Sequence, residues 1–214
     1  GTHADVRGGG DGRLDVALIA ADNPCAAAGI FTTNDVKAAP VVLCQQHLAA
    51  RGTARAIVAN SGNANACTGA QGRADARRMA VTAAEALGCA EAEVLVCSTG
   101  RIGRALPIDR IEKAIAEAAA SACANAGSVE AAARAILTSD TRPKTASARF
   151  VVDGRAVTVN GMAKGAGMID PNMATMLAFL WTDAKATPSY LQGVLAAAAD
   201  ASFNRISVDG DMST

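Results

Sequence analysis

Short apolar runs typical of strands mix with amphipathic helical repeats along this chain, and the two kinds do not alternate strictly. The expected strands lie at residues 16–19, 29–32, 40–43, 56–59, 94–97 and 175–181, with a hairpin at residues 148–159. Asp153 and Gly154 form the two-residue turn signal of that hairpin. A doubly wound nucleotide-binding sheet requires a regular strand–helix–strand order. The pattern therefore predicts an α/β fold in which sheets and helices form a layered sandwich, as one structural unit.

Amphipathic segments predict helices at residues 71–87, 107–127, 128–137 and 187–202. Gly88 suits a left-handed helix end, and Pro107 suits a first helical turn. Ser128 is the expected N-cap of the third helix, and Thr187 with Pro188 begins the fourth. The faces expected to point inward are Ile108, Ile111, Ile115 and Ala119 in the second helix and Leu191, Val194, Leu195 and Ala198 in the fourth.

Composition limits both the core and the class of protein. Half of the residues are hydrophobic but only 3% are aromatic, so Ala, Val, Leu and Ile must build the core. The 20 basic and 20 acidic residues balance, which argues against nucleic acid or an anionic membrane as partner. His3 and His47 are far apart and no cysteines show CxxC spacing, so we expect free buried thiols and no metal site. With neither a membrane-length apolar run nor a signal-like start, a cytoplasmic enzyme fits best.

The segment from Lys164 to Thr175 carries the most specific chemical pattern. A glycine-rich, lysine-bearing loop leads through a Pro-Asn turn to Ala174 and Thr175. Cleavage between Ala174 and Thr175 would give the threonine a free α-amine with a pKa of about 7.7–8.0, which can act as general base for its own hydroxyl. One residue would then supply both nucleophile and base. The competing interpretation is a plain turn followed by an ordinary strand threonine.

Three other polar segments are candidates for a site. Residues 98–103 place hydroxyl and backbone N–H donors at a strand end, where they can hold an oxyanion, or they form a simple strand-to-helix loop. Residues 60–69 contain asparagines that either bind substrate, brace the backbone of the site or form an Asn-rich turn. Residues 138–144 group polar side chains after a helix, and composition does not choose a role for them.

Together these segments resemble the ornithine acetyltransferase family, also called bifunctional glutamate N-acetyltransferase, of arginine biosynthesis. The resemblance covers nearly the whole chain and keeps the family's order through residues 31–42, 60–69, 98–103, 138–144, 164–177 and 202–214. It implies the layered α/β sandwich of the self-cleaving threonine-nucleophile type. It also implies a precursor cut before Thr175, so that residues 1–174 are an α chain and residues 175–214 begin a β chain.

The resemblance also implies a role for each matching residue. Thr175 is the nucleophile that takes the acetyl group from N-acetylornithine and passes it to glutamate. Thr99 and Gly100 form the oxyanion-hole pair, and Thr138, Lys164 and Thr175 contact substrate. The family needs no cofactor; some members also use acetyl-CoA as acetyl donor, and no motif here decides whether this one does. Its members assemble from two α and two β chains.

Two departures from the family pattern qualify this prediction. Arg101 stands where the family usually has an apolar residue. The family's β chain continues far beyond the position of Thr214 and adds acidic and polar site residues, so this chain corresponds to a fragment expected to be inactive alone. The alternatives are a threonine-nucleophile amidase or aminopeptidase with water as acceptor, an acyltransferase paralogue of secondary metabolism, and a non-catalytic domain.

Overall fold

The computed structural model describes residues 1–170, 172 and 175–212. The strands are β1 (Val16–Ala26), β2 (Thr53–Asn63), β3 (Val94–Arg101), β4 (Lys144–Val152), β5 (Arg155–Lys164) and β6 (Leu177–Thr182). The helices are α1 (Ala39–Arg51), α2 (Gly69–Leu87), α3 (Ile108–Ala120), α4 (Ala126–Ala135) and α5 (Pro188–Ala201), with short 3-10 turns at Glu91–Glu93 and Phe203–Arg205. None of the helices in this described part is long and apolar enough to cross a membrane.

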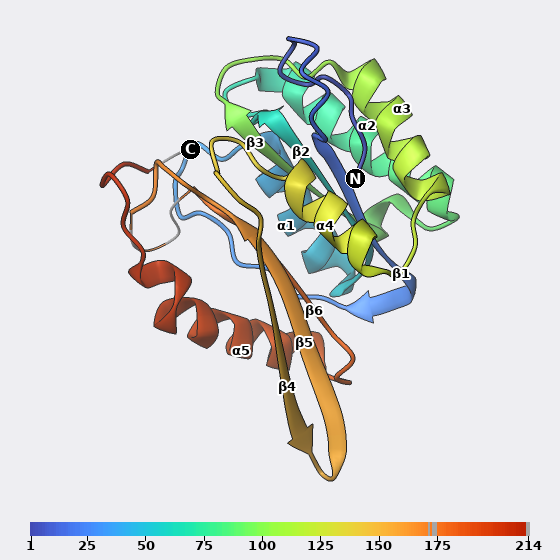
Figure 1. Cartoon of the computed structure of the whole chain (residues 1–214), viewed down its shortest axis with the longest axis vertical. Coiled ribbons are helices and arrows are strands. Elements are labelled where there is room, and N and C mark those ends of the chain that lie inside the picture. Colours follow the sequence, from blue (N-terminus) through green and yellow to red (C-terminus); the bar gives the residue numbers. More distant parts are fainter. Residues whose placement is uncertain (171, 173–174, 213–214) are drawn as a thin grey trace.

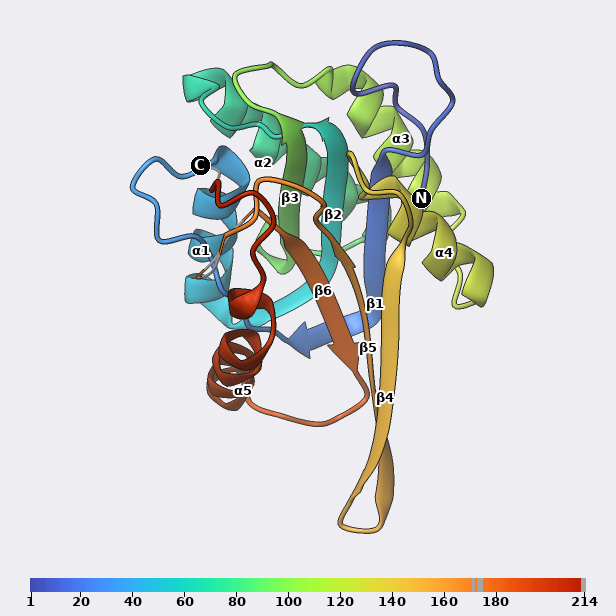
Figure 2. The ribbon, with the colours of Figure 1, turned by 60° about the vertical axis from the view of Figure 1, so that its left-hand side comes forward.

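The strands form two three-stranded sheets, β1-β2-β3 and β4-β5-β6 (Figures 1 and 2). β1 is antiparallel to β2, β2 is parallel to β3, and all pairs of the second sheet are antiparallel. A parallel pair needs a long crossover, and α2 supplies it between β2 and β3. The sheets and helices therefore stack in layers, as the irregular element order predicts.

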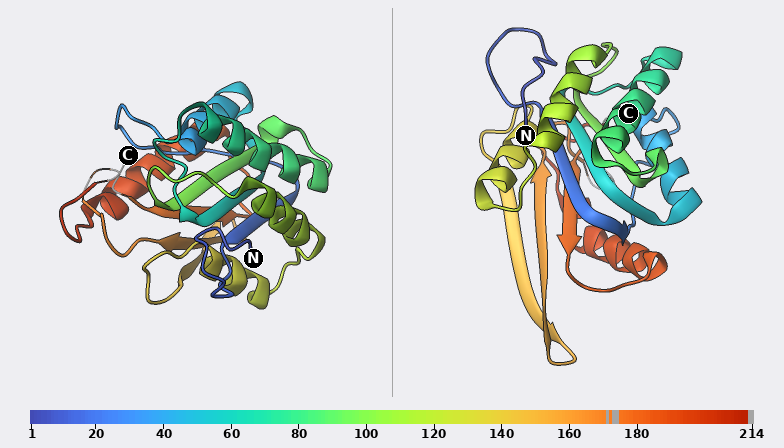
Figure 3. Two further views of the ribbon diagram at one scale, coloured as in Figure 1. Left: turned by 90° about the horizontal axis from the view of Figure 1, so that it is seen from above. Right: turned by 90° about the vertical axis from the view of Figure 1, so that its right-hand side faces the viewer.

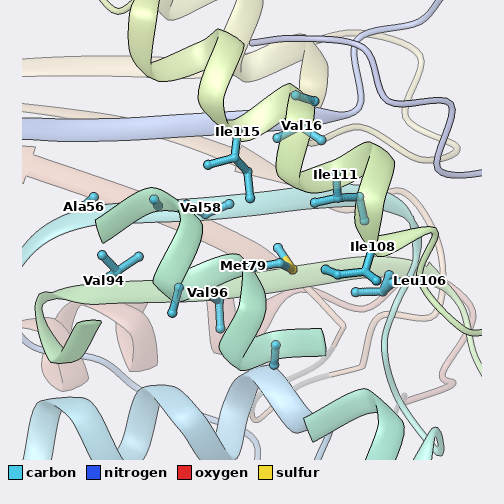
Figure 4. Close-up of a cluster of buried hydrophobic side chains, with 14 of the residues drawn as sticks. Val16, Ala56, Val58, Met79, Val94, Val96, Leu106, Ile108, Ile111 and Ile115 are labelled. Carbon is cyan, nitrogen blue, oxygen red and sulfur yellow. The ribbon is translucent and has the colours of Figure 1, made fainter. Parts of the chain in front are cut away.

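The main hydrophobic core lies between the first sheet and helices α2 and α3 (Figure 4). Its largest side chains are aliphatic or sulfur-containing, namely Val16, Val58, Met79, Val94, Val96, Leu106, Ile108, Ile111 and Ile115. Strand residues alternate between faces, so Val16 and Val58 point into this core while Ala17 and Ala59 point to the other side. A chain with few aromatics thus builds its core from branched aliphatic side chains, as predicted.

A second cluster fills the space between the two sheets and α4. Ala17 and Ala59 from the first sheet meet Met162 of β5 and Phe179 of β6, and α4 contributes small residues together with Ile136. Because alanine side chains are short, sheet and helix backbones can approach closely here. The distal part of the β4–β5 hairpin projects beyond this cluster into solvent, and every residue of β4 is exposed (Figure 3).

Residues 40–43 form the first turn of α1, so the predicted strand there is wrong. Pro40 lies in the first helical turn, where its fixed φ is favourable and its missing N–H costs nothing. Pro40, Cys44 and His47 are buried at helical spacing, and Gly52 ends the helix in the left-handed conformation. A four-residue apolar window is too short to distinguish this helical period from a buried strand.

A second predicted strand and the boundary between two helices also differ from prediction. Residues 29–32 form no strand; β1 instead extends to Ala26 through an irregularity between Ala20 and Cys25. α3 ends at Ala120, and α4 begins at Ala126 with Asn125 as N-cap, whose side chain accepts a hydrogen bond from the Ser128 backbone N–H at 2.8 Å. Ser128 is therefore inside the helix, because the asparagine three residues earlier already satisfies its N–H.

The other helix ends and the hairpin turn follow prediction. Gly88 ends α2 with φ 64°, and the Thr187 side chain caps α5. Asp153 and Gly154 take φ values of 50° and 74° in the hairpin turn. The face of α5 predicted to be buried is turned toward a large cavity instead, and Val194 is 48% exposed.

Candidate active site

The carboxyl ends of β2 and β3 bring two of the predicted polar segments together. In the parallel register Ser61 lies beside Thr99 and Gly62 lies beside Gly100. Residues 60–69 and 98–103, far apart in sequence, therefore meet at one edge of the sheet. Ligands of α/β proteins commonly bind beyond the carboxyl ends of parallel strands.

Gly100 is held against the neighbouring strand. Its φ is 129°, and a Cβ at this position would lie 2.3 Å from the carbonyl oxygen of Gly62. No side chain fits at that distance, and a residue other than glycine rarely adopts that φ. The close approach fixes the backbone next to Thr99.

Two asparagines near the carboxyl end of β2 brace this loop. The Ser98 hydroxyl donates to Asn60 Oδ1 at 2.6 Å, and Asn60 Nδ2 donates to the Asn63 carbonyl at 2.9 Å. Asn63 Nδ2 in turn donates to the Ala105 carbonyl at 2.9 Å. Of the roles predicted for these amides, bracing of the backbone is the one that these contacts support.

Lys164 links the second sheet to the end of β3. It is the last residue of β5, and its Nζ donates a hydrogen bond to Thr99 Oγ1 at 2.9 Å. Lys164 is 5% exposed and Thr99 is 6% exposed. Burial lowers the pKa of Lys164, while the negative charge of Asp140 opposes this and the charge of Lys144 adds to it. Its ammonium therefore gives up a proton more readily than that of a surface lysine.

Asp140 is the residue of this site whose role the sequence leaves undecided. Its side chain is fully covered, and Oδ1 accepts hydrogen bonds from Lys144 Nζ at 2.5 Å and from the Gly165 backbone N–H at 2.8 Å. Burial alone raises the pKa of Asp140, but the hydrogen bonds from Lys144, Gly165 and Thr138 outweigh it and hold the pKa below its usual value. Asp140 thus fixes the loop that follows Lys164.

We expect Asp140→Asn to destabilise the protein by about 1–3 kcal/mol at neutral pH, because charge-assisted hydrogen bonds at a covered position are lost. Because the pKa of Asp140 is lower in the folded than in the unfolded chain, the ionised carboxylate stabilises the fold at pH values above its unfolded pKa of about 3.9. That contribution is lost as the pH falls through the folded pKa. The difference between variant and wild type should therefore shrink below about pH 4. Urea denaturation across pH measures this. Asp11→Asn, in an exposed pair with Arg13, is the control and should change little.

Thr175 lies just before β6, not within a strand as predicted. Its Oγ1 is buried and has no hydrogen-bond partner among the described residues. Its carbonyl oxygen would lie 3.7 Å from a Cβ at Gly165, which places Thr175 against the glycine-rich loop that follows Lys164. A buried, unpaired hydroxyl costs about 1–3 kcal/mol and calls for an explanation such as a catalytic role. Ala174, the other side of the predicted cleavage site, lies outside the described residues.

One cavity of about 2280 Å³ unites these groups. Its walls come from both sheets and from α5, and they include Thr99, Gly100, Thr138, Lys164 and Thr175. The structure therefore brings together every predicted site residue that it describes, although their catalytic roles stay predictions. Thr138 contributes to the wall, and its backbone N–H faces the Asp140 carboxylate at 3.4 Å.

The cysteines differ in part from expectation. All six are free thiols, but Cys25, Cys67 and Cys123 are exposed and Cys44 is buried. The prediction of buried thiols is therefore wrong for the three exposed ones. Within the described residues, no group of three or more His, Cys, Asp or Glu side chains is arranged to hold a metal ion.

Comparison with known proteins gives the family of this chain. A model of the ArgJ family matches residues 1–214. The chain belongs to the ArgJ family. It is 55% identical to the arginine biosynthesis bifunctional protein ArgJ of Symbiobacterium thermophilum, over 100% of this chain and 52% of that protein. It is 52% identical to the protein of the same name from Geobacter sulfurreducens, over 95% and 51% of the two. The chain thus spans about half the length of the curated ArgJ relatives it matches.

Solved ArgJ structures share the fold. Arginine biosynthesis bifunctional protein ArgJ from Bacillus halodurans superposes with a TM-score of 0.74 at 40% identity, covering 81% of this chain and 88% of the solved one. Ornithine acetyltransferase from Mycobacterium tuberculosis, solved in complex with ornithine, gives a TM-score of 0.72 at 41% identity, with 81% and 90% covered. These similarities confirm the predicted family and its α/β fold class.

Proposed function

We propose that the protein containing this chain is an acetyltransferase of arginine biosynthesis that moves the acetyl group of N-acetylornithine to glutamate through an acetyl-Thr175 intermediate. The observation that carries this proposal is the buried Thr175 hydroxyl, which has no hydrogen-bond partner among the described residues and lines the same cavity as the hydrogen-bonded Lys164 and Thr99 pair. The names of the ArgJ relatives, and the ornithine complex of one solved structure, support the substrate class.

Self-cleavage between Ala174 and Thr175 would activate the nucleophile. It would yield an α chain of residues 1–174 and a β chain beginning at Thr175, whose new α-amine accepts the hydroxyl proton. Coverage supports such a division: this chain covers 88% of the solved Bacillus halodurans chain but 52% of a curated relative.

The transfer then proceeds in two balanced steps. Thr175 Oγ1 attacks the acetyl carbonyl, its proton passes to the α-amine and on to the departing ornithine amine, and an acetyl ester remains on Thr175. The amine of glutamate attacks this ester, forms N-acetylglutamate and returns a proton to the threonine oxygen. Each step passes through a tetrahedral oxyanion that needs hydrogen-bond donors.

Thr99 and Gly100 are the proposed donors to that oxyanion. Thr99 Oγ1 already accepts a hydrogen bond from Lys164, so its own hydrogen is left to donate. The nearby positive charge of Lys164 strengthens that donation. The backbone N–H of Gly100 is the second donor, in a conformation fixed by the contact with Gly62.

We propose that the reaction needs no cofactor, since side chains and backbone supply every group in these steps. A thioester donor such as acetyl-CoA would undergo the same attack by Thr175. We also propose that the cleaved protein assembles from two α and two β chains.

We expect Lys164→Met in the full-length protein to lower kcat about 10²–10³-fold, because Thr99 loses the partner that orients and polarises it. KM for N-acetylornithine should rise as well if Lys164 also meets the substrate carboxylate. Steady-state kinetics separate the two effects. Lys113→Met on the exposed side of α3 is the control. An unchanged KM would rule out a contact between Lys164 and the substrate carboxylate. An unchanged kcat would rule out a role for Lys164 in stabilising the oxyanion.

Product analysis tests the proposed reaction itself. Full-length protein supplied with N-acetylornithine and glutamate is expected to form N-acetylglutamate and ornithine in equal amounts, measured by mass spectrometry. Release of acetate at the same rate with and without glutamate would instead identify an amidase that uses water as acceptor.

A further inference from the structure

A second, smaller cavity of about 480 Å³ is lined by four arginines, Arg7, Arg101, Arg104 and Arg110. Val6, Gly8, Asn63 and the segment of residues 105–107 complete its wall, and no described acidic residue lines it. Positive charge is therefore concentrated here, although the basic and acidic residues of the whole chain balance. We call this group the arginine cavity.

Most of this positive charge is not neutralised by the described part of the chain. Arg110 pairs with Asp5 at 3.0 Å. The Arg101 guanidinium donates only to neutral oxygens, namely Asn63 Oδ1 at 3.1 Å and the Arg7 backbone carbonyl. Arg7 and Arg104 have no acidic partner among the described residues. Like charges that line one place on the surface repel one another, and a bound anion would relieve that repulsion.

The start of α3 adds to the same field. Pro107, its N-cap, lines the cavity and offers no side-chain cap, and the helix runs for 13 residues. The positive end of the helix dipole therefore lies at the cavity wall. Asp109 in the first turn of α3 offsets part of this field, so the guanidinium groups and not the helix end define the site.

The arginine cavity adjoins the oxyanion loop. Arg7 and Arg101 line the large cavity as well, and Arg101 directly follows Gly100. A Cβ on Gly62, the residue that Gly100 packs against, would lie 3.0 Å from the Arg7 backbone nitrogen. Figures 1 and 2 show the N-terminal loop, in dark blue, beside the segment that joins β3 to α3. A ligand held by these arginines would therefore lie next to the acyl-transfer site.

We propose that the arginine cavity is a binding site for a phosphate-bearing anion. One guanidinium satisfies a single carboxylate through two hydrogen bonds, whereas several guanidiniums around one cavity match a phosphate or diphosphate, which carries more charge and more acceptor oxygens. The ligand is either a free phosphate-bearing metabolite or the phosphate part of a thioester acyl donor whose reactive end reaches Thr175. Only this second source rests on the proposed acetyl transfer.

Calorimetric titration of the full-length protein with pyrophosphate and with coenzyme A tests the site. Arg104→Gln removes an exposed charge that has no acidic partner in the described part of the chain, and Arg149→Gln, on the exposed β4 strand outside the cavity, is the matched control. We expect the affinity for pyrophosphate to fall about tenfold or more in Arg104→Gln, to stay unchanged in Arg149→Gln, and to weaken with added salt. Thermal denaturation confirms that both variants fold.

Competition between the ligands distinguishes the two sources. If coenzyme A displaces pyrophosphate and loses affinity equally in Arg104→Gln, the cavity holds the phosphates of a thioester donor. If pyrophosphate binds but coenzyme A does not displace it, the ligand is a free phosphate-bearing metabolite. The proposed anion site would be overturned if the wild type did not bind pyrophosphate, or if Arg149→Gln lost as much affinity for pyrophosphate as Arg104→Gln. Because the titration contains no acyl donor, its outcome is independent of transfer at Thr175.

Discussion

Thr175→Ala is expected to leave the full-length precursor uncut and to reduce acetyl transfer by at least about 10⁴-fold, since the variant lacks both the hydroxyl and the free threonine amine. Intact mass under denaturing conditions should show two fragments, divided between Ala174 and Thr175, for the wild type and one chain for the variant. Stability should not fall, because the deleted Oγ1 is buried without a partner among the described residues.

Two companion variants make this result specific. Thr175→Ser keeps a hydroxyl at the same position and should still cleave and transfer, more slowly. Thr141→Ala, at an exposed position in the neighbouring loop, should behave as the wild type. A single uncut chain from the wild type would mean that Thr175 never gains its amine, and the mechanism proposed here would have to be dropped.

Gly100→Ala is expected to destabilise the protein by about 3 kcal/mol or more and to abolish transfer. The new Cβ would lie 2.3 Å from the Gly62 carbonyl oxygen, at a φ of 129° that alanine rarely adopts. The two strand ends would have to separate, which moves the proposed oxyanion donors. Urea denaturation measures the stability, and single-turnover acetylation of Thr175 measures the chemistry.

Gly193→Ala provides the matched control for that substitution. Gly193 lies inside α5 and a Cβ there would meet no atom within 4 Å. Alanine is the better helix former, so this variant should be slightly more stable than the wild type. Equal stability of Gly100→Ala and wild type would show that the contact between Gly100 and Gly62 imposes no constraint.

Local patterns predict much of the secondary structure. The helix ends at Gly88 and Thr187 and the turn at Asp153 and Gly154 depend on neighbouring residues alone, so sequence is sufficient to find them. The sequence predicts a strand at residues 40–43, where α1 begins, because its first turn is a short apolar run whose helical period appears only when Cys44 and His47 are included. The sequence predicts Ser128 as an N-cap, but the Asn125 side chain accepts a hydrogen bond from the Ser128 backbone N–H and is the cap instead.

Some features of the candidate site also follow from the sequence, whereas others appear only in the folded structure. The Lys164 to Thr175 segment and the Ser-Thr-Gly strand end can be recognised from sequence alone, because the chemistry of each motif lies in adjacent residues. Together with the other segments they also indicate the family. The folded chain alone reveals that Lys164 donates to Thr99, 65 positions away in sequence, and that Asp140 fixes the loop after Lys164. It also reveals that Arg7 and Arg104 share a cavity. Such contacts depend on how strands pair and sheets stack, and that pairing reflects the packing of the whole chain.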